Sequence, residues 1–259
     1  MKNEVNLIFL VMLKTLLEET LVVLPARGGS KRIAKKNIKS IHGNPMIYWP
    51  LSVLSRIFKP ENIIVSTECN EIKKVVEKTG LQIPYARPLD LANDFTSTTA
   101  VTKHALDWYL TNVKYVRFVL TVYPTAVLLN EDDIITALEH CNSDPDCHTV
   151  ISACSYNRPV QRALYEGRNG YAKMFWPENY KQRSQDLAEA HYDAGQFYLS
   201  KTDALLCTEN IFDHNVKLML LDPDKAVDID NHHDFLIAEK LLIKQRESVL
   251  NFSWFGNLT

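Results

Sequence analysis

Short apolar runs alternate with longer amphipathic stretches over most of the chain. The runs have the length and composition of buried strands, and they lie at residues 21–24, 62–66, 116–122, 148–153, 217–221 and 226–229. The amphipathic stretches have the length of helices, and they lie at residues 45–58, 71–79, 98–110, 132–140 and 234–245. This alternation predicts an α/β fold with a mostly parallel sheet covered by helices on both faces. Ligands of such folds bind beyond the carboxyl ends of the strands, so we expect the chemistry there.

The N-terminal residues 1–19 precede this pattern and contain an apolar run at residues 7–13. The run is too short to cross a bilayer, for which about twenty residues are needed. It also lacks the basic flank and small-residue cleavage site of a signal peptide. We interpret residues 1–19 as an N-terminal extension that forms an extra helix packed on the body.

Residues 157–200 break the alternation because they are rich in Arg, Tyr, Trp and Asn and contain Pro159 and Pro177. Such a stretch is typical of a lid or a dimerisation arm, not of a core element. It lies within a main domain that we assign to residues 20–247, and residues 248–259 are interpreted as a C-terminal tail.

Composition narrows the class of protein. A chain of 259 residues with 46% hydrophobic residues can bury one sizeable core. Its formal net charge of −2 argues against a protein that coats nucleic acid, so any anion site must be local. The five cysteines are scattered without close pairs, which favours buried thiols in a reducing cytoplasm over zinc ligation or disulfides. We therefore expect a cytoplasmic protein with no membrane partner.

A cationic, glycine-containing turn follows the first predicted strand, where residues 25–32 read Pro-Ala-Arg-Gly-Gly-Ser-Lys-Arg. The two glycines allow the backbone to pass close to an anion, and Arg27, Ser30 and Lys31 add donors for phosphate oxygens. The spacings of the Walker loop and of the dinucleotide fingerprint are both absent. The turn predicts a phosphate-binding loop; the alternative is a solvated basic turn.

An acidic pair, Asp228 and Asp230, stands at the end of the last predicted strand. Residues two apart on a strand share a face, with Cα atoms roughly 6.5–7 Å apart. Two such carboxylates can hold Mg²⁺ against the oxygens of a triphosphate. The alternative is a polar edge in which Asp230 or Asn231 caps the last helix.

A third motif combines Arg87 with a run of hydroxyl side chains at residues 96–99. Pro88 biases the backbone of Arg87 toward an extended conformation. Thr96 or Ser97 could cap the helix that follows. From these residues alone, a ligand site and a helix cap with a surface salt bridge remain equally open.

These motifs, from about residue 21 to residue 244, resemble those of the cytidylyltransferases that make CMP-activated acidic sugars, the acylneuraminate cytidylyltransferase family. The resemblance implies a Rossmann-like three-layer nucleotidyltransferase fold with a protruding arm, Mg²⁺ bound by Asp228 and Asp230, and a homodimer. It implies catalytic roles for Arg27, Lys31, Asp228 and Asp230. The nucleotide-binding residues that it implies are Ala26, Arg27, Gly28, Gly29, Ser30, Lys31, Asn37, Arg87, Thr96 and Thr98.

Residues 183–187, Arg-Ser-Gln-Asp-Leu, and residues 191–198, His-Tyr-Asp-Ala-Gly-Gln-Phe-Tyr, resemble the pseudaminic acid branch of this family. Tyr123 stands where the sialic acid branch commonly has glutamine, which argues against sialic acid. An N-acylated sugar acid needs a cation, amides and aromatic edges, and this part of the chain offers all three. The sugar-binding residues implied by the resemblance are Tyr123, Arg162, Arg183, Gln185, Asp193, Gln196 and Tyr198. The alternative for the residues on the arm is an interface without substrate contact.

The resemblance thus predicts an enzyme that transfers CMP from CTP to the anomeric hydroxyl of a nonulosonic acid, with pseudaminic acid as the first candidate, and releases pyrophosphate. Two alternatives stay open. The acceptor could be N-acetylneuraminic acid or an eight-carbon ulosonic acid, or the chain could be a nucleotide-binding module without catalytic activity.

Overall fold

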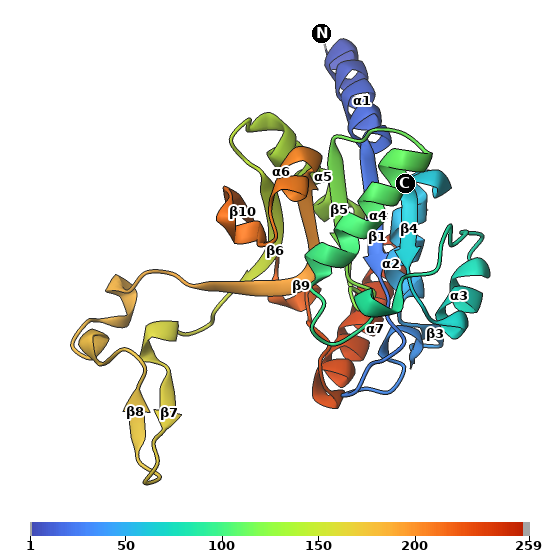
Figure 1. Ribbon diagram of the computed structural model, residues 1–259. Coiled ribbons are helices and arrows are strands. Elements are labelled where there is room, and N and C mark those ends of the chain that lie inside the picture. The colour runs from blue at the N-terminus through green and yellow to red at the C-terminus, as the bar shows by residue number, and fades with distance from the viewer. Residues whose placement is uncertain (1, 256–259) are drawn as a thin grey trace.

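The computed structural model describes the backbone of residues 2–255 and the side chains of residues 7–247. Its central sheet has six strands: β1 (Thr20–Pro25), β4 (Ile63–Ser66), β5 (Phe118–Val122), β6 (Thr149–Ser155), β9 (His191–Lys201) and β10 (Val216–Leu220). They lie in the order β10-β6-β9-β5-β1-β4 (Figure 1). The strands pair in parallel except for β9, which runs antiparallel between β5 and β6. The mostly parallel α/β sheet predicted from the sequence is confirmed.

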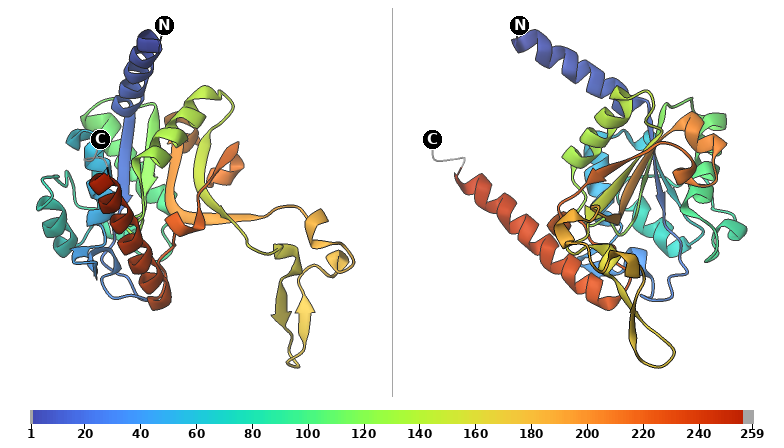
Figure 2. Two further views of the ribbon diagram at one scale, coloured as in Figure 1. Left: turned by 180° about the vertical axis from the view of Figure 1, so that it is seen from behind. Right: turned by 90° about the vertical axis from the view of Figure 1, so that its left-hand side faces the viewer.

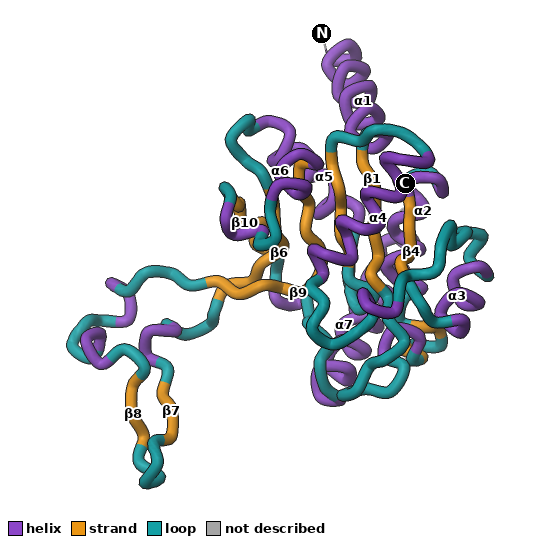
Figure 3. The backbone as a smooth tube through the Cα atoms, viewed as in Figure 1, coloured by secondary structure: helices purple, strands orange, loops and turns teal. Residues whose placement is uncertain are grey.

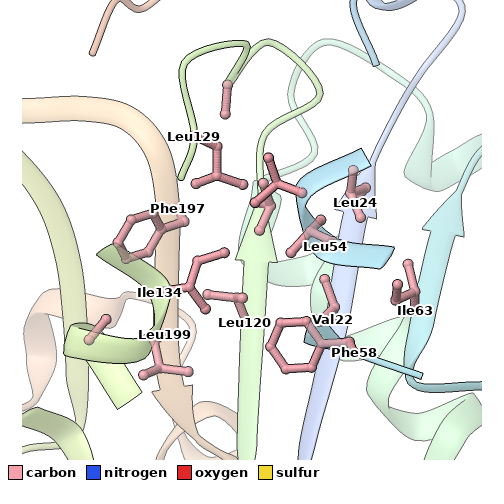
Figure 4. Close-up of a cluster of buried hydrophobic side chains, with 14 of the residues drawn as sticks. Val22, Leu24, Leu54, Phe58, Ile63, Leu120, Leu129, Ile134, Phe197 and Leu199 are labelled. Atoms are coloured by element: carbon pink, nitrogen blue, oxygen red, sulfur yellow. The ribbon is translucent and has the colours of Figure 1, made fainter. Parts of the chain in front are cut away.

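Helices cover both faces of this sheet. Their bounds are α2 (Tyr48–Ile57), α3 (Asn70–Glu77), α4 (Thr98–Asn112), α5 (Glu131–Ser143) and α6 (Thr202–Cys207). Successive residues of β1 point to opposite faces of the sheet. Val22 packs in the cluster that contains residues of α2 and α5, whereas Val23 packs in the cluster that contains residues of α4 and α6. Figure 4 shows Ile134 of α5 next to Leu120 of β5 in the first cluster. Burial on both faces explains why the strands read as continuous apolar runs.

The structure departs from the predicted elements most clearly at residues 226–229 and at β9. Residues 226–229 were predicted as a strand, and this is wrong: they form an irregular loop after a short 3₁₀ turn at Pro223–Lys225. Ile229 is fully buried there, where it packs against the last helix and against the loop that follows β1. Its apolar character therefore predicted a strand, although the residue lies in a loop. Strand β9 was missed because its start lies within the Arg- and Tyr-rich stretch of residues 157–200.

An arm leaves the body after β6 and returns through β9, and both views show it projecting from the sheet (Figures 1 and 2). It carries an antiparallel hairpin formed by β7 (Leu164–Glu166) and β8 (Ala172–Met174). Its aromatic side chains are largely exposed, among them Tyr171, Phe175 and Tyr180. From Ala194 onward the same stretch is core, since Phe197 and Leu199 are fully buried. The stretch predicted as an arm therefore contains an arm followed by the central strand.

The first and last helices extend from the body (Figure 2). Helix α1 (Lys2–Glu18) contacts the core through its last turn, where Leu16 is buried, whereas the side chains of residues 7–12 are exposed. Helix α7 (His232–Phe255) continues past residue 247, where the tail was expected to begin, and residues 256–259 lie outside the described residues. No helix in the described part of the chain is long and apolar enough to cross a membrane.

Candidate active site

A cavity of about 250 Å³ lies at the carboxyl ends of β1 and β5. Loops gather at this end of the sheet (Figure 3). The cavity brings together eight of the residues singled out in the sequence: Arg27, Ser30, Lys31, Asn37, Arg87, Thr96, Thr98 and Tyr123. These residues come from three separate stretches of the chain, and the parallel sheet makes them neighbours because its strands end at a common edge.

The loop after β1 is held against the start of α3. The Gly28 N–H donates to the Glu68 carboxylate at 2.6 Å. A Cβ at Gly28 would lie 2.9 Å from the Cβ of Cys69, so this approach requires glycine. The Asn37 side chain is buried and donates from Nδ2 to the Arg27 carbonyl at 2.9 Å, so Asn37 shapes the loop from within. Ala26 is buried and its N–H continues the pairing with β4 through the Ser66 carbonyl.

Two cations of the loop point toward the same carboxylate. Arg27 Nη1 lies 2.7 Å from Asp94 Oδ1 and donates to the Asn93 carbonyl at 3.0 Å, and Lys31 Nζ pairs with the other oxygen of Asp94. Hydrogen bonds from Lys31 and Arg27 hold the pKa of Asp94 below its ordinary value. The Lys31 side chain is 80% exposed, so the ammonium group is open to an incoming anion. Asp94 was not singled out from the sequence, because nothing local indicates its two distant partners.

Arg87 lies inside the cavity wall. Its side chain is only 4% exposed, its Nε donates to Ser66 Oγ at 3.1 Å, and its Nη2 donates to the Ser66 carbonyl. Burial lowers the pKa of this guanidinium. The surface salt bridge considered for Arg87 is wrong, since the residue is buried. The helix cap is correct for Ser97, whose hydroxyl accepts the Ala100 N–H at 3.1 Å at the start of α4.

The acidic pair lies beside the cationic loop. Arg32 Nη2 is 2.8 Å from Asp230 Oδ1, and Lys36 Nζ is 3.4 Å from the same oxygen and donates to the Ile229 carbonyl at 2.7 Å. A hydrophobic cluster that contains Ile33 and Ile229 joins the two loops beneath these contacts. The structure thus brings together two motifs that are about 200 residues apart in the sequence.

The start of α7 leaves the Asp230 side chain available. Asn231 Oδ1 accepts the N–H groups of His233 at 2.8 Å and of Asp234 at 3.1 Å, as a capping residue does. Asp234 in turn accepts the N–H of Asp230 at 2.9 Å. The cap is therefore Asn231, and the Asp230 carboxylate is directed to the cations.

Asp228 is exposed, whereas Asp230 is partly buried. Partial desolvation of its carboxylate, followed by repulsion from Asp230, raises the pKa of Asp228 above the ordinary value. Gly195 lies against it: a Cβ added there would be 2.9 Å from Asp228 Cγ. No group of three or more His, Cys, Asp or Glu side chains among the described residues is arranged to hold a metal ion. Asp228 and Asp230 nevertheless fit a hard divalent cation such as Mg²⁺, because both are oxygen ligands and because their mutual repulsion would be relieved by positive charge.

A chain of hydroxyl groups runs from the cavity to the outside. The Tyr123 hydroxyl lies 3.2 Å from Thr98 Oγ1 and donates to the Tyr198 hydroxyl at 3.3 Å, and Tyr198 donates to the Asp193 carboxylate. The rings of Tyr123 and Tyr198 meet edge to face, with centroids 5.6 Å apart. Burial raises the pKa of both tyrosines. These residues are far apart in the sequence, so their connection could not be predicted from it.

The remaining residues named for the sugar do not line this cavity. Gln196 is buried and donates from Nε2 to the carbonyls of Ala194 and Val227, which braces β9 against the loop of the acidic pair. Arg162 donates to the Gln182 carbonyl, and Arg183 forms a two-point ion pair with Asp186 at 2.7 and 3.0 Å. These two arginines and Gln185 belong to the arm, which extends away from the body (Figure 1).

Known proteins match this chain over most of its length. The family model described as Cytidylyltransferase matches residues 21–252. The chain is 34% identical over 232 residues to the pseudaminic acid cytidylyltransferase of Campylobacter jejuni subsp. jejuni serotype O:2, covering 89% of this chain and 99% of that protein. It is 30% identical over 242 residues to the CMP-N,N′-diacetyllegionaminic acid synthase of the same organism, covering 90% of this chain and 99% of that protein.

Among solved structures, the CMP:2-keto-3-deoxy-manno-octonic acid synthetase in complex with CTP aligns with a TM-score of 0.64 and 16% identity, over 88% of this chain and 99% of that chain. This likeness confirms the nucleotidyltransferase fold expected from the sequence. The match of the family model spans the cavity, the acidic pair and the arm alike. The chain therefore belongs to the cytidylyltransferase family.

Proposed function

We propose that this enzyme transfers CMP from CTP to the anomeric hydroxyl of a nonulosonic acid, with pseudaminic acid as the preferred acceptor, and releases pyrophosphate. The observation that carries the proposal is the contact between the cationic loop and the acidic pair, with Arg32 and Asp230 2.8 Å apart. A triphosphate needs both cations and metal-binding carboxylates within its own length, and this arrangement supplies them. The similarity to a pseudaminic acid cytidylyltransferase supports this acceptor.

The nucleotide would bind in the cavity. Arg27 and Lys31 would exchange the Asp94 carboxylate for phosphate oxygens, assisted by Ser30 and by the backbone of Gly28 and Gly29. Arg87, Thr96 and Thr98 would bind the nucleoside, where the buried guanidinium of Arg87 can donate to acceptor atoms of cytosine. Ala26 and Asn37 would contribute by fixing the loop.

Asp228 and Asp230 would hold Mg²⁺. When bound, the ion supplies positive charge that stabilises the triphosphate and the departing pyrophosphate. Arg32 and Lys36 keep the Asp230 carboxylate in place from the side of the cationic loop. Gly195 allows β9 to lie directly against Asp228.

The reaction would be an in-line displacement at phosphorus. The anomeric hydroxyl of the sugar gives its proton to solvent and its oxygen forms a bond to the α-phosphorus, while the bond from that phosphorus to the bridging oxygen breaks and pyrophosphate leaves with that oxygen. Arg27 and Lys31 stabilise the charge that develops on the leaving group. Most of the rate gain would come from positioning and charge stabilisation, as in other transfers at phosphorus.

We further propose that the enzyme acts as a homodimer in the cytoplasm, where its five free cysteines would stay reduced. Arg162, Arg183 and Gln185 could reach a sugar only if the arm of a partner subunit supplied them, since the arm extends away from the body (Figure 2) and none of the three lines the cavity. Mixing the inactive variants Arg183→Ala and Asp230→Asn tests this. Activity should reappear in the mixture if sites are shared between subunits, whereas a mixture that stays inactive would contradict the shared site.

The acceptor is tested by supplying CTP, Mg²⁺ and one sugar acid at a time, and by measuring phosphate after pyrophosphatase treatment. Pseudaminic acid should give the highest rate, and Asp230→Asn should serve as the inactive control. A higher rate with N-acetylneuraminic acid or an eight-carbon ulosonic acid would reassign the substrate. Absence of pyrophosphate release with every acid would favour a nucleotide-binding module without catalytic activity.

A further inference from the structure

The Asp193 carboxylate is held at both of its oxygens. Oδ1 accepts the N–H of Gly195 at 2.8 Å, and the other oxygen accepts the Tyr198 hydroxyl. The residue is nevertheless exposed, at the point where the arm joins β9. Within the described side chains, no Lys, Arg or His forms an ion pair with it. Asp193 is therefore a rigid carboxylate that faces solvent and lacks a cationic partner.

Its position links the cavity with the acidic pair. Tyr198 receives a hydrogen bond from Tyr123, which lines the cavity, and Gly195 lies against Asp228. Asp193 therefore stands just outside the cavity, past the wall that Tyr123 forms. An acceptor that attacks a nucleotide bound in the cavity must approach from a solvent-accessible side such as this one.

The chemistry of this carboxylate restricts what it can bind. An ionised carboxylate only accepts hydrogen bonds, and each of its oxygens keeps a free lone pair after the contacts with Gly195 and Tyr198. Because these contacts fix the carboxylate, its free lone pairs have set directions. The negative charge repels the carboxylate of a sugar acid and attracts N–H and O–H donors. Asp193 can therefore orient an acidic sugar by its donor groups.

Resting on the proposed function, we propose that Asp193 is a specificity-determining residue that accepts a hydrogen bond from an acylamino N–H or a hydroxyl of the sugar acid, and that Tyr198 is the residue that positions it. Tyr198 acts through Asp193 and need not touch the sugar. The hydrogen bonds from Thr98 through Tyr123 fix the position of the Tyr198 hydroxyl relative to the nucleotide cavity.

The experiment uses the full-length enzyme with Asp193→Asn, Tyr198→Phe and the double variant. Tyr115→Phe is the matched control, because the Tyr115 hydroxyl also donates to an aspartate, Asp203, at 3.4 Å, but before β5 and thus at the opposite end of the sheet. The KM for the sugar acid, the KM for CTP and kcat are measured with an N-acylated nonulosonic acid and with an ulosonic acid that has only hydroxyl donors.

We expect Asp193→Asn and Tyr198→Phe to raise the KM for the sugar acid about tenfold to a hundredfold, the size of one hydrogen bond to a charged group. The KM for CTP should stay within about twofold, which also shows that the variants are folded. The double variant should be no worse than Asp193→Asn, because residues acting through one contact are not additive. A larger effect with the N-acylated acid assigns the donor as N–H, and equal effects assign it as a hydroxyl.

An unchanged KM for the sugar acid in both single variants, with normal wild-type turnover, would overturn this inference and leave the proposed function intact. Equal increases in the KM for the sugar acid and the KM for CTP would show that Asp193 and Tyr198 have only a structural role, and would also overturn the inference. Multiplied effects in the double variant would refute the positioning role of Tyr198. If the wild-type enzyme releases no pyrophosphate with any acid, the proposed function fails and this inference falls with it.

Discussion

Gly195→Ala tests whether the close approach of β9 to Asp228 controls activity. Gly195 has a φ of +61°, which is in the left-handed region, and an added Cβ would lie 2.9 Å from Asp228 Cγ and 3.1 Å from its Oδ1. The substitution therefore introduces backbone strain and a collision with a proposed metal ligand. These two effects have different consequences and can be measured separately.

The strain of a left-handed alanine is about 1–2 kcal/mol. For a chain of this size, each kcal/mol lowers the melting temperature by about 2–4 °C. The collision is a matter of distance, because non-bonded carbon atoms prefer separations of about 3.5–4.0 Å. Asp228 must therefore shift by roughly 0.5–1 Å, and a misplacement of about 1 Å can reduce turnover about a hundredfold.

The assay is Mg²⁺-dependent pyrophosphate release, measured together with the melting temperature. Gly80→Ala is the control, because Gly80 has a φ of +88° but no atom within 4 Å of an added Cβ. Both variants should lose a few degrees of melting temperature. Only Gly195→Ala should lose turnover, by about two orders of magnitude.

Full turnover in Gly195→Ala, accompanied by the expected loss of melting temperature, would refute the reasoning, because Asp228 would then tolerate displacement. Comparable losses of turnover in both glycine variants would assign the effect to general destabilisation.

Four further predictions follow from the site and the core. Asp230→Asn should lower pyrophosphate release by about a hundredfold or more with an unchanged melting temperature, and near-normal turnover would refute its metal role. Removing Mg²⁺ with EDTA should abolish release and adding Mg²⁺ back should restore it; activity that persists after chelation would contradict the metal site. Raising NaCl from 0.1 to 1 M shortens the screening length from about 10 to about 3 Å, so the KM for CTP should rise severalfold through exposed Lys31, and a KM insensitive to salt would argue against phosphate binding there. Burial raises the pKa of Tyr109 to about 12. Because the fold then favours its neutral hydroxyl, which donates to Asn62 at 3.0 Å, the free energy of unfolding in urea should fall between pH 10 and 12, and Tyr109→Phe should flatten that decline.

The local features of the site could be read from the sequence. Gly28 follows a strand and lies too close to Cys69 for a side chain, and Arg27 and Lys31 lie within three residues of it, so a short stretch was enough to predict an anion site. The alternation of apolar runs and amphipathic stretches likewise predicted a sheet with helices on both faces, because burial imposes a periodicity within each element.

Other features depended on where distant segments meet. Ile229 was predicted in a strand because it stands in a short apolar run. In the structure it is buried in a cluster with Ile33 and not by pairing with a neighbouring strand. The partners of Asp94 and the hydroxyl chain from Thr98 through Tyr123 to Tyr198 join residues that are 25 to 75 positions apart.

The sequence by itself determined the α/β alternation, the cationic glycine-containing turn and the acidic pair, since each is encoded in residues that are near one another along the chain. Only the tertiary structure decided that β9 enters the sheet antiparallel between β5 and β6, and this order brings Asp193 and Gly195 beside Tyr123 and Asp228. The physical reason is that strand order is fixed by packing and hydrogen bonds between segments, which no local periodicity records.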